Sequence, residues 1–193
     1  MPAHEREAMT AFDGIFNNYR QLTAICDAFQ AKVFSRHPAL VTCAERCFGC
    51  CKLQTVNTLE AFLVYDRIRP IRDELNAIAE NEAVSCRLLH DGRCVIYPIR
   101  PLICRTHGVP IIGEELTDGR VDCCPLNFQD RTLQDLNREY VLDIELVTEN
   151  LMRLNLAFCK ALGAKRLAAE RFFISDILAG KLPKEFATVT FSA

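Results

Sequence analysis

Nine cysteines crowd the middle of this 193-residue chain, and they are the residues whose type and spacing could do chemistry. They are Cys43, Cys47, Cys50, Cys51, Cys86, Cys94, Cys104, Cys123 and Cys124. Converged thiolates repel one another, and a bound soft cation removes that cost, so such clusters are typical of zinc sites and iron–sulfur clusters. We therefore take all nine as candidate metal ligands and expect the middle of the chain to unfold when the metal is removed.

The number of thiols allows one metal centre or two, because a tetrahedral site uses four thiolates. Adjacent residues rarely serve one metal comfortably, so one member each of Cys50–Cys51 and Cys123–Cys124 is expected at a given centre. With nine clustered thiols and only four histidines, thiolate-only ligation is favoured, and with it an iron–sulfur cluster slightly over zinc. A pair of four-cysteine zinc sites fits the count equally well.

Three basic residues lie beside Cys104 in the stretch RPLICRTHG. A centre with four thiolates on a zinc ion carries a charge of about −2, which a partly buried site must offset. Arg100, Arg105 and His107 are therefore expected around the bound cofactor, and His107 could instead be a direct ligand.

Other chemistries fit the sequence less well. The spacing of Cys43, Cys47 and Cys50 also matches radical S-adenosylmethionine enzymes, but the chain lacks the repeated strand–helix units of their barrel. The first residues contain no apolar signal segment, so a cytoplasmic location is expected, where thiols stay reduced and disulfides are disfavoured. A net charge of −2 gives no basic footprint for a nucleic acid, and no apolar run is long enough for a membrane.

The elements that must position these cysteines can be read from the apolar spacing. A helix over about 3–35 presents Phe12, Tyr19 and Cys26 on one face and ends at His37-Pro38. Asn57 and Glu60 predict a capped helix that Pro70 divides. Cys159, like Cys26, is interpreted as an inert buried thiol.

The centre and the C-terminal part give three further predictions. Asp91-Gly92 predicts a two-stranded hairpin with one cysteine on each arm, followed by an irregular segment over 98–127. Thr132 and Asp135 resemble a capping box for a helix about 45 Å long that Gly163 ends. A shorter helix is expected over about 164–179.

The fold class that follows is mainly α, with helices at both ends around a central irregular cysteine-rich, metal-binding region with a short β-hairpin. We expect a single domain over 1–193, with a cysteine-cluster core at 43–124 and flanking helices at 1–38 and 132–180. The terminal helices are expected to pack together and support the centre.

The residues from Cys43 to Cys124 resemble the CxxCxxCC cysteine-cluster proteins, a bacterial family described as zinc- or iron-chelating. The resemblance rests on CAERCFGCC, on the segment from Cys86 to Arg105 with its Y-x-x-R-P motif, and on CCP. It covers less than half of the chain, and the first cysteine gap holds three residues rather than two. The resemblance implies a metal site of about eight cysteines, and a link to flagellin lysine N-methylase, which is described with the same cysteine domain.

Three functions remain open at this point. The first is a metal-binding protein that holds an iron–sulfur cluster, for electron transfer or sensing. The second is a zinc-stapled module that contacts a protein partner without catalysis. The third, implied by the resemblance, is an enzyme or enzyme subunit linked to protein lysine N-methylation.

Overall fold

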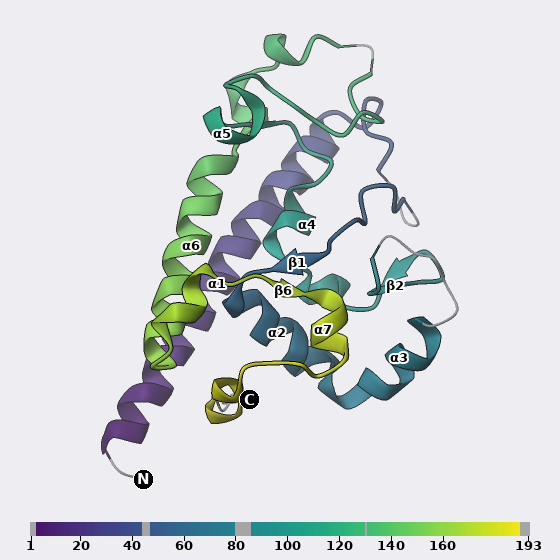
Figure 1. Cartoon of the computed structure of the whole chain (residues 1–193). Helices are drawn as coiled ribbons and strands as arrows, with labels where there is room; N and C mark the ends of the chain where they lie inside the picture. The colour runs from purple at the N-terminus through teal and green to yellow at the C-terminus, as the bar shows by residue number, and fades with distance from the viewer. Residues whose placement is uncertain (1–2, 44–46, 80–85, 130, 190–193) are drawn as a thin grey trace.

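The computed structural model describes residues 3–43, 47–79, 86–129 and 131–189, and the fold is mainly α (Figure 1). The first helix, α1 (Ala3–Arg36), is the longest, and His37-Pro38 follows its last turn as the sequence predicts. Helix α6 (Ile144–Ala161) lies along one side of α1, and the short helix α4 (Leu102–Thr106) lies on the other. The terminal helices therefore pack together, as expected.

Helices α1 and α6 are antiparallel. Near the start of α1, the ring of Phe12 lies with its centroid 5.6 Å from that of Phe158, which is close to the end of α6. At the other end of α1, Val33 is buried in one apolar cluster with Ile144 and Val147 from the first turns of α6. The two helices thus form the long frame to which the shorter elements attach.

The core consists of two clusters of buried apolar side chains. The first is built on aromatic rings from α1, α2 (Thr58–Ile68), α6 and the C-terminal segment, including Phe16, Phe62, Phe158 and Phe186. The second lies at the opposite end of the α1–α6 pair, around Cys26, Val33 and Phe128. Burial of side chains of this size contributes roughly 1.5–3 kcal/mol each, so these contacts dominate the stability of the frame.

The start of α2 confirms the predicted cap. The Asn57 side chain accepts a hydrogen bond from the backbone N–H of Glu60, and its amide donates to the Glu60 carboxylate at 3.2 Å. A 3-10 turn over Arg69–Ile71, η1, contains Pro70 and separates α2 from α3 (Arg72–Ala79). Proline has no N–H to continue the helical ladder, which explains the division.

The strands are only two residues long and form three small pairs within the described residues. Strand β1 (Thr55–Val56) pairs antiparallel with β6 (Phe172–Phe173), and β2 (Leu89–His90) pairs antiparallel with β3 (Arg93–Cys94). Strand β4 (Ile111–Ile112) pairs parallel with β5 (Leu142–Asp143). These pairs tie the central segments to both ends of the chain.

The prediction of a long helix that begins at Thr132 is wrong for its first part. Residues 132–143 form the 3-10 turns η3 (Leu133–Asp135) and η4 (Arg138–Tyr140) and then β5, and Thr132 makes no side-chain cap. The backbone N–H of Leu142 donates to the carbonyl of Pro110 at 2.8 Å, and pairing of β5 with β4 keeps these residues extended. Asp143 caps the helix instead, and Gly163 follows its end with φ of +70°.

Two further predictions need correction. The segment 98–127 is not wholly irregular, since it contains α4, β4 and α5 (Glu114–Thr117), and the 3-10 turn η2 (Tyr97–Ile99) overlaps its start. The helix expected over 164–179 is broken into a 3-10 turn η5 (Lys165–Ala169), strand β6 and helix α7 (Ile174–Leu178). The pairing of β6 with β1 outweighs the helix propensity of this stretch. A final 3-10 turn, η6, covers Lys184–Thr188.

In the described part of the chain, no helix combines the length and the apolar character needed to cross a membrane.

Candidate metal centre

The hairpin of β2 and β3 holds two cysteines close to its base. Asp91 and Gly92 both have positive φ, of 48° and 72°, as a tight two-residue hairpin turn requires. Cys94 pairs with Leu89 in the strand register, and the carbonyl of Cys86 accepts a hydrogen bond from the Leu89 N–H at 3.0 Å. The hairpin prediction is confirmed, although Cys86 lies three residues before its strand rather than on it.

A third cysteine is presented by α4 and a fourth by the loop before β1. The N–H of Leu102, the first residue of α4, donates to the Glu60 carboxylate at 2.8 Å, which fixes the helix that carries Cys104 against α2. Cys51 follows a tight turn in which its own N–H donates to the carbonyl of Phe48 at 2.9 Å. Cys51 and Cys94 both pack against the first core cluster, in which Cys86 is buried.

These four cysteines, Cys51, Cys86, Cys94 and Cys104, form what we call the inner cysteine group. Burial raises the pKa of the Cys104 thiol, and nearby Cys86, Cys94, Glu60 and Cys51 raise it further. Burial also raises the pKa of Cys51, with further contributions from Cys86 and Cys94. Because charge effects weaken with distance, these mutual contributions indicate that the four thiols lie in one region although they come from three segments of the chain.

The other five clustered cysteines form the outer cysteine group: Cys43, Cys47, Cys50, Cys123 and Cys124. Burial raises the pKa of the Cys43 thiol, opposed by a hydrogen bond from Asn127, and Cys47, Cys124 and Cys50 raise it as neighbours. Burial raises the pKa of Cys123 to about 12, and Cys124 and Cys43 add to the shift. Cys47 and Cys50 are exposed, whereas Cys86 of the inner cysteine group is buried.

The adjacent residues Cys50 and Cys51 lie where the two groups meet, since the charge of Cys51 raises the pKa of Cys50 and a hydrogen bond with Cys50 lowers that of Cys51. Burial raises the pKa of the Cys50 thiol, and among the cysteines around it are Cys47 and Cys124 of the outer cysteine group. Cys51 belongs with Cys86 and Cys94, although Cys47 also raises its pKa. Cys123 and Cys124 both lie in the outer cysteine group.

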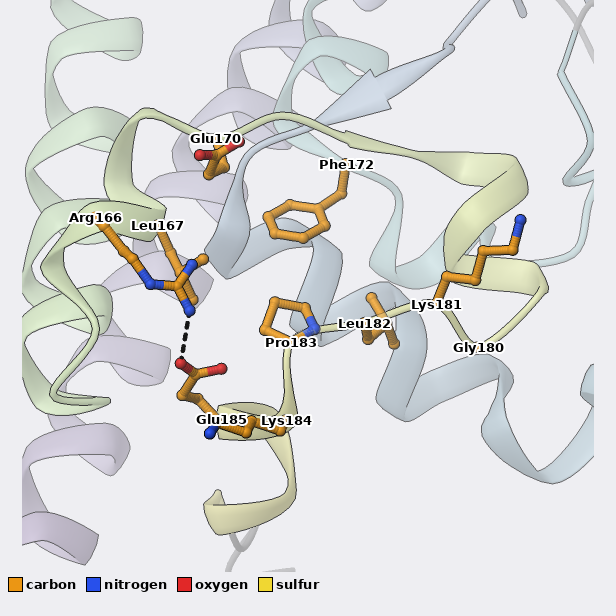
Figure 2. Close-up of a pocket in the computed structure, with 10 residues that line it drawn as sticks. All are labelled: Arg166, Leu167, Glu170, Phe172, Gly180, Lys181, Leu182, Pro183, Lys184 and Glu185. Atoms are coloured by element: carbon orange, nitrogen blue, oxygen red, sulfur yellow. Dashed lines mark hydrogen bonds and ion pairs between the residues drawn. The ribbon is translucent and has the colours of Figure 1, made fainter.

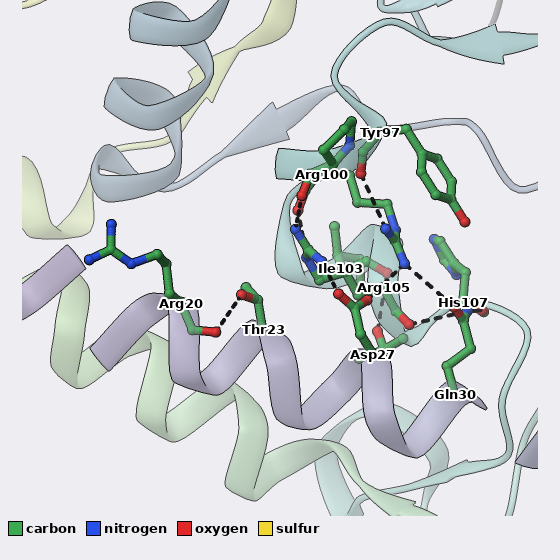
Figure 3. Close-up of polar contacts among 11 residues, drawn as sticks. Arg20, Thr23, Asp27, Gln30, Tyr97, Arg100, Ile103, Arg105 and His107 are labelled. Atoms are coloured by element: carbon green, nitrogen blue, oxygen red, sulfur yellow. Dashed lines mark hydrogen bonds and ion pairs between the residues drawn. The ribbon is translucent and has the colours of Figure 1, made fainter. Parts of the chain in front are cut away.

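The basic residues expected near the cysteines are arranged around an acid on α1 (Figure 3). Arg100 donates to Asp27 at 2.8 Å, and Arg105 forms an ion pair with the other oxygen of the same carboxylate. Arg105 also donates to the carbonyls of Arg100 and Pro98, and Arg100 donates to the carbonyl of Tyr97. Both guanidinium groups are therefore paired within the fold.

Arg100 also influences the inner cysteine group directly. Burial raises the pKa of Cys94, and the Arg100 guanidinium acts in the opposite direction, which places positive charge near this sulfur. His107 lies at the end of α4 with an exposed side chain, and its backbone carbonyl accepts a hydrogen bond from Gln30 at 3.2 Å. Of the three basic residues, Arg100 is the one whose charge lowers the pKa of an inner-group thiol, that of Cys94.

The sulfurs are neighbours without being closed into a coordination shell. In the residues that the structure describes, no three or more Cys, His, Asp or Glu side chains are arranged so that they could hold a metal ion. The thiols of each group would have to draw closer to share an ion. Cys26 and Cys159 are buried in the apolar clusters, as predicted for inert thiols.

Sequence reasoning missed Asp27 and Asn127 as residues that organise this region. Asp27 lies on α1, far along the chain from its arginine partners, and no local pattern marks it. Asn127 lies shortly after CCP and is 3% exposed. Its burial is visible only in the structure, so the sequence gives no sign of its role. Glu60 was identified only as part of a helix cap, but it also accepts hydrogen bonds from Tyr19 and Leu102.

A separate depression lies between η5, β6 and the segment after α7 (Figure 2). It is open, has a volume of about 710 Å³ and is crossed by the ion pair of Arg166 with Glu185 at 2.8 Å. All eleven cysteines lie within the described residues, and none of them lines this depression. Its charged lining is mixed in sign, so it carries no defined chemistry.

Comparison of the chain with protein-family models, curated proteins and solved structures found no match.

Proposed function

We propose that this protein binds metal through cysteine thiolates, holding an iron–sulfur cluster or zinc at the inner cysteine group. The proposal is supported by the mutual influence of four thiols on their pKa values: Cys51, Cys86, Cys94 and Cys104, which come from a loop, a hairpin and a helix. Soft thiolates in sets of four are the ligands that zinc and iron–sulfur clusters take in proteins.

The residues present fit such a group in donor type and number. When bound, an iron–sulfur cluster would supply one-electron chemistry, and zinc would supply a structural cross-link. The chain's own contribution is to hold the four thiols in one partly buried region, through the hairpin turn for Cys86 and Cys94 and through Glu60 for α4. Arg100 adds positive charge beside Cys94, which favours its thiolate form.

The burial of these thiols has a consequence for binding. Burial raises the pKa of Cys104 and of Cys86, so both are protonated near neutral pH in the absence of metal. Ligation requires the thiolate, and binding therefore releases protons and weakens as the pH falls. On binding, the four sulfurs would move closer together and complete a coordination shell around the ion.

Purification without oxygen tests the proposal. We expect either broad absorption near ~400 nm with bound iron and sulfide, or a colourless protein that contains zinc by elemental analysis. Cys94→Ser and Cys104→Ser should each lower the metal content, whereas Cys159→Ser, which changes a buried thiol outside both groups, should not. A wild-type protein without iron or zinc, or one whose metal content ignores Cys94→Ser and Cys104→Ser, would refute the proposal.

A further inference from the structure

The outer cysteine group is organised around one glycine. The Sγ of Cys123 lies 3.5 Å from the carbonyl oxygen of Gly108, and a Cβ added to Gly108 would lie only 2.9 Å from the Sγ of Cys43. Gly108 also has φ of +89°, a conformation that glycine adopts without strain. A backbone without a side chain thus lets the two sulfurs approach the same peptide.

Asn127 fixes one of these sulfurs through an amide whose orientation is determined by its partners. Its Oδ1 accepts a hydrogen bond from the backbone N–H of Thr42 at 2.9 Å, and an N–H can only donate. Its Nδ2 donates to the carbonyl of Gly108 at 2.7 Å, and a carbonyl can only accept. The second hydrogen on Nδ2 is therefore available to the Sγ of Cys43, which lies 3.2 Å away.

An N–H directed at a sulfur favours the thiolate, because a thiolate is a better acceptor than a thiol. The Asn127 side chain is buried, so this donor is held in place by Gly108 and Thr42 rather than by solvent. The Asn127 amide thus opposes the effect of burial on the Cys43 thiol and fixes the position of its sulfur. A sulfur arranged in this way suits ligation of a cation.

We propose that the outer cysteine group is a second metal centre, separate from the inner one, with Cys43 and Cys123 among its ligands and Asn127 as the residue that positions Cys43. The inference rests on the proposed function, because it extends thiolate ligation to a second set of cysteines. Cys50 and Cys51, whose side chains share a hydrogen bond, lie at the boundary between the two centres, and in this division Cys50 is assigned to the outer one. Because Cys47 and Cys50 are exposed, the outer centre exchanges its metal more readily.

The test measures how fast a chromogenic chelator removes metal from the full-length, reduced protein after purification without oxygen. The wild-type protein should release its metal in two phases. Cys43→Ser with Cys123→Ser should abolish the fast phase and keep the slow one, and Cys94→Ser with Cys104→Ser should do the opposite. Circular dichroism of each variant checks that the helices are retained.

The outcomes separate this inference from the proposed function. If the outer pair of substitutions leaves metal content and release unchanged while the inner pair lowers them, there is no second centre and the proposed function stands. A single release phase that both pairs abolish means one shared centre, which overturns the division. A wild-type protein without metal refutes both proposals.

The role of Asn127 has its own readout. Asn127→Asp keeps an acceptor for Thr42 but removes the donor to Cys43, and we expect the outer centre to bind its metal roughly 10–100-fold more weakly by chelator competition. The slow phase should not change. Asn150→Asp on α6 is the matched control, and equal behaviour of the two variants would exclude a positioning role for Asn127.

Discussion

Asp27 is a single carboxylate that serves two buried guanidinium groups. The side chains of Arg100 and Arg105 are only 10% and 6% exposed, while that of Asp27 is 40% exposed. Removing the acid from such an arrangement leaves buried positive charge without its partner, which costs more than the pair contributes when intact. The carboxylate therefore anchors the segment that carries Cys94 and Cys104 to α1.

Asp27→Asn should lower the free energy of unfolding by about 3 kcal/mol, the lower end of the range for breaking a buried ion pair, because solvent screens the exposed side of Asp27. Urea denaturation followed by circular dichroism measures this change. Asp13→Asn, at an exposed position on the same helix, should stay within about 0.5 kcal/mol of wild type. Equal stability of the two variants would contradict the anchoring role.

Cys26 gives a prediction about pH that does not depend on metal. Burial raises the pKa of its thiol from 9.0 to about 11, and the charge of Asp27 adds to the effect. The folded state thus holds this proton more tightly than the unfolded state. The contribution of Cys26 to stability is fully present below pH 9 and is lost as the pH rises through about 11, a change on the order of 3 kcal/mol.

Cys26→Ala should therefore be destabilising at pH 8, where it leaves a small cavity, and the difference from wild type should shrink or reverse toward pH 11. Urea denaturation of both proteins at several pH values measures this difference. A difference that stays constant from pH 8 to pH 11 would show that the Cys26 thiolate is not penalised in the fold.

Glu60 joins three helices. Its carboxylate accepts hydrogen bonds from the Tyr19 hydroxyl of α1 at 3.0 Å and from the Leu102 N–H of α4 at 2.8 Å, while Glu60 itself lies in α2. The side chain is almost fully buried, and burial raises its pKa, opposed by these donors. The position of Cys104 therefore depends on an acid 44 residues earlier in the chain.

Glu60→Ala should cost about 1–3 kcal/mol of stability, because the buried Leu102 N–H loses its acceptor. It should also lower the metal content, if the inner cysteine group binds metal, by releasing α4. Differential scanning calorimetry and elemental analysis measure the two effects. Glu170→Ala, at an exposed position, is the control, and a Glu60→Ala protein as stable as this control would contradict the linkage.

The elements that the sequence predicts well are those whose signals are local. Helix α1, the Asn57 cap, the break at Pro70 and the Asp91-Gly92 turn follow from spacing, capping and turn chemistry within a few residues. The helices predicted over 132–143 and 164–173 do not form because strand pairing with distant partners overrides their helical spacing. The sequence does not predict how the cysteines are grouped, because the grouping depends on contacts of Glu60, Asp27 and Asn127 with residues far away in the chain.

At the scale of the whole molecule, the inner cysteine group borders the first apolar cluster, whereas Cys47 and Cys50 of the outer cysteine group are exposed. The frame of α1, α2 and α6 is held by buried phenylalanine rings. The outer cysteine group and much of the hairpin have fewer such contacts, with Cys47, Cys50 and Arg93 exposed. Any stabilisation that metal supplies should therefore be concentrated in the cysteine-bearing segments.

Removal of metal by a chelator under reducing conditions should accordingly leave most of the helical circular dichroism signal and loosen the centre. Limited trypsin digestion with mass spectrometry should then show faster cleavage after Lys52 and Arg93, which border the two cysteine groups, while Lys32 in α1 and Arg153 in α6 stay protected by their helices. The protein before chelator treatment is the control. An unchanged cleavage pattern after complete metal loss would mean that the centre is held by its own packing alone, and general cleavage with loss of helix would mean that the frame also depends on metal.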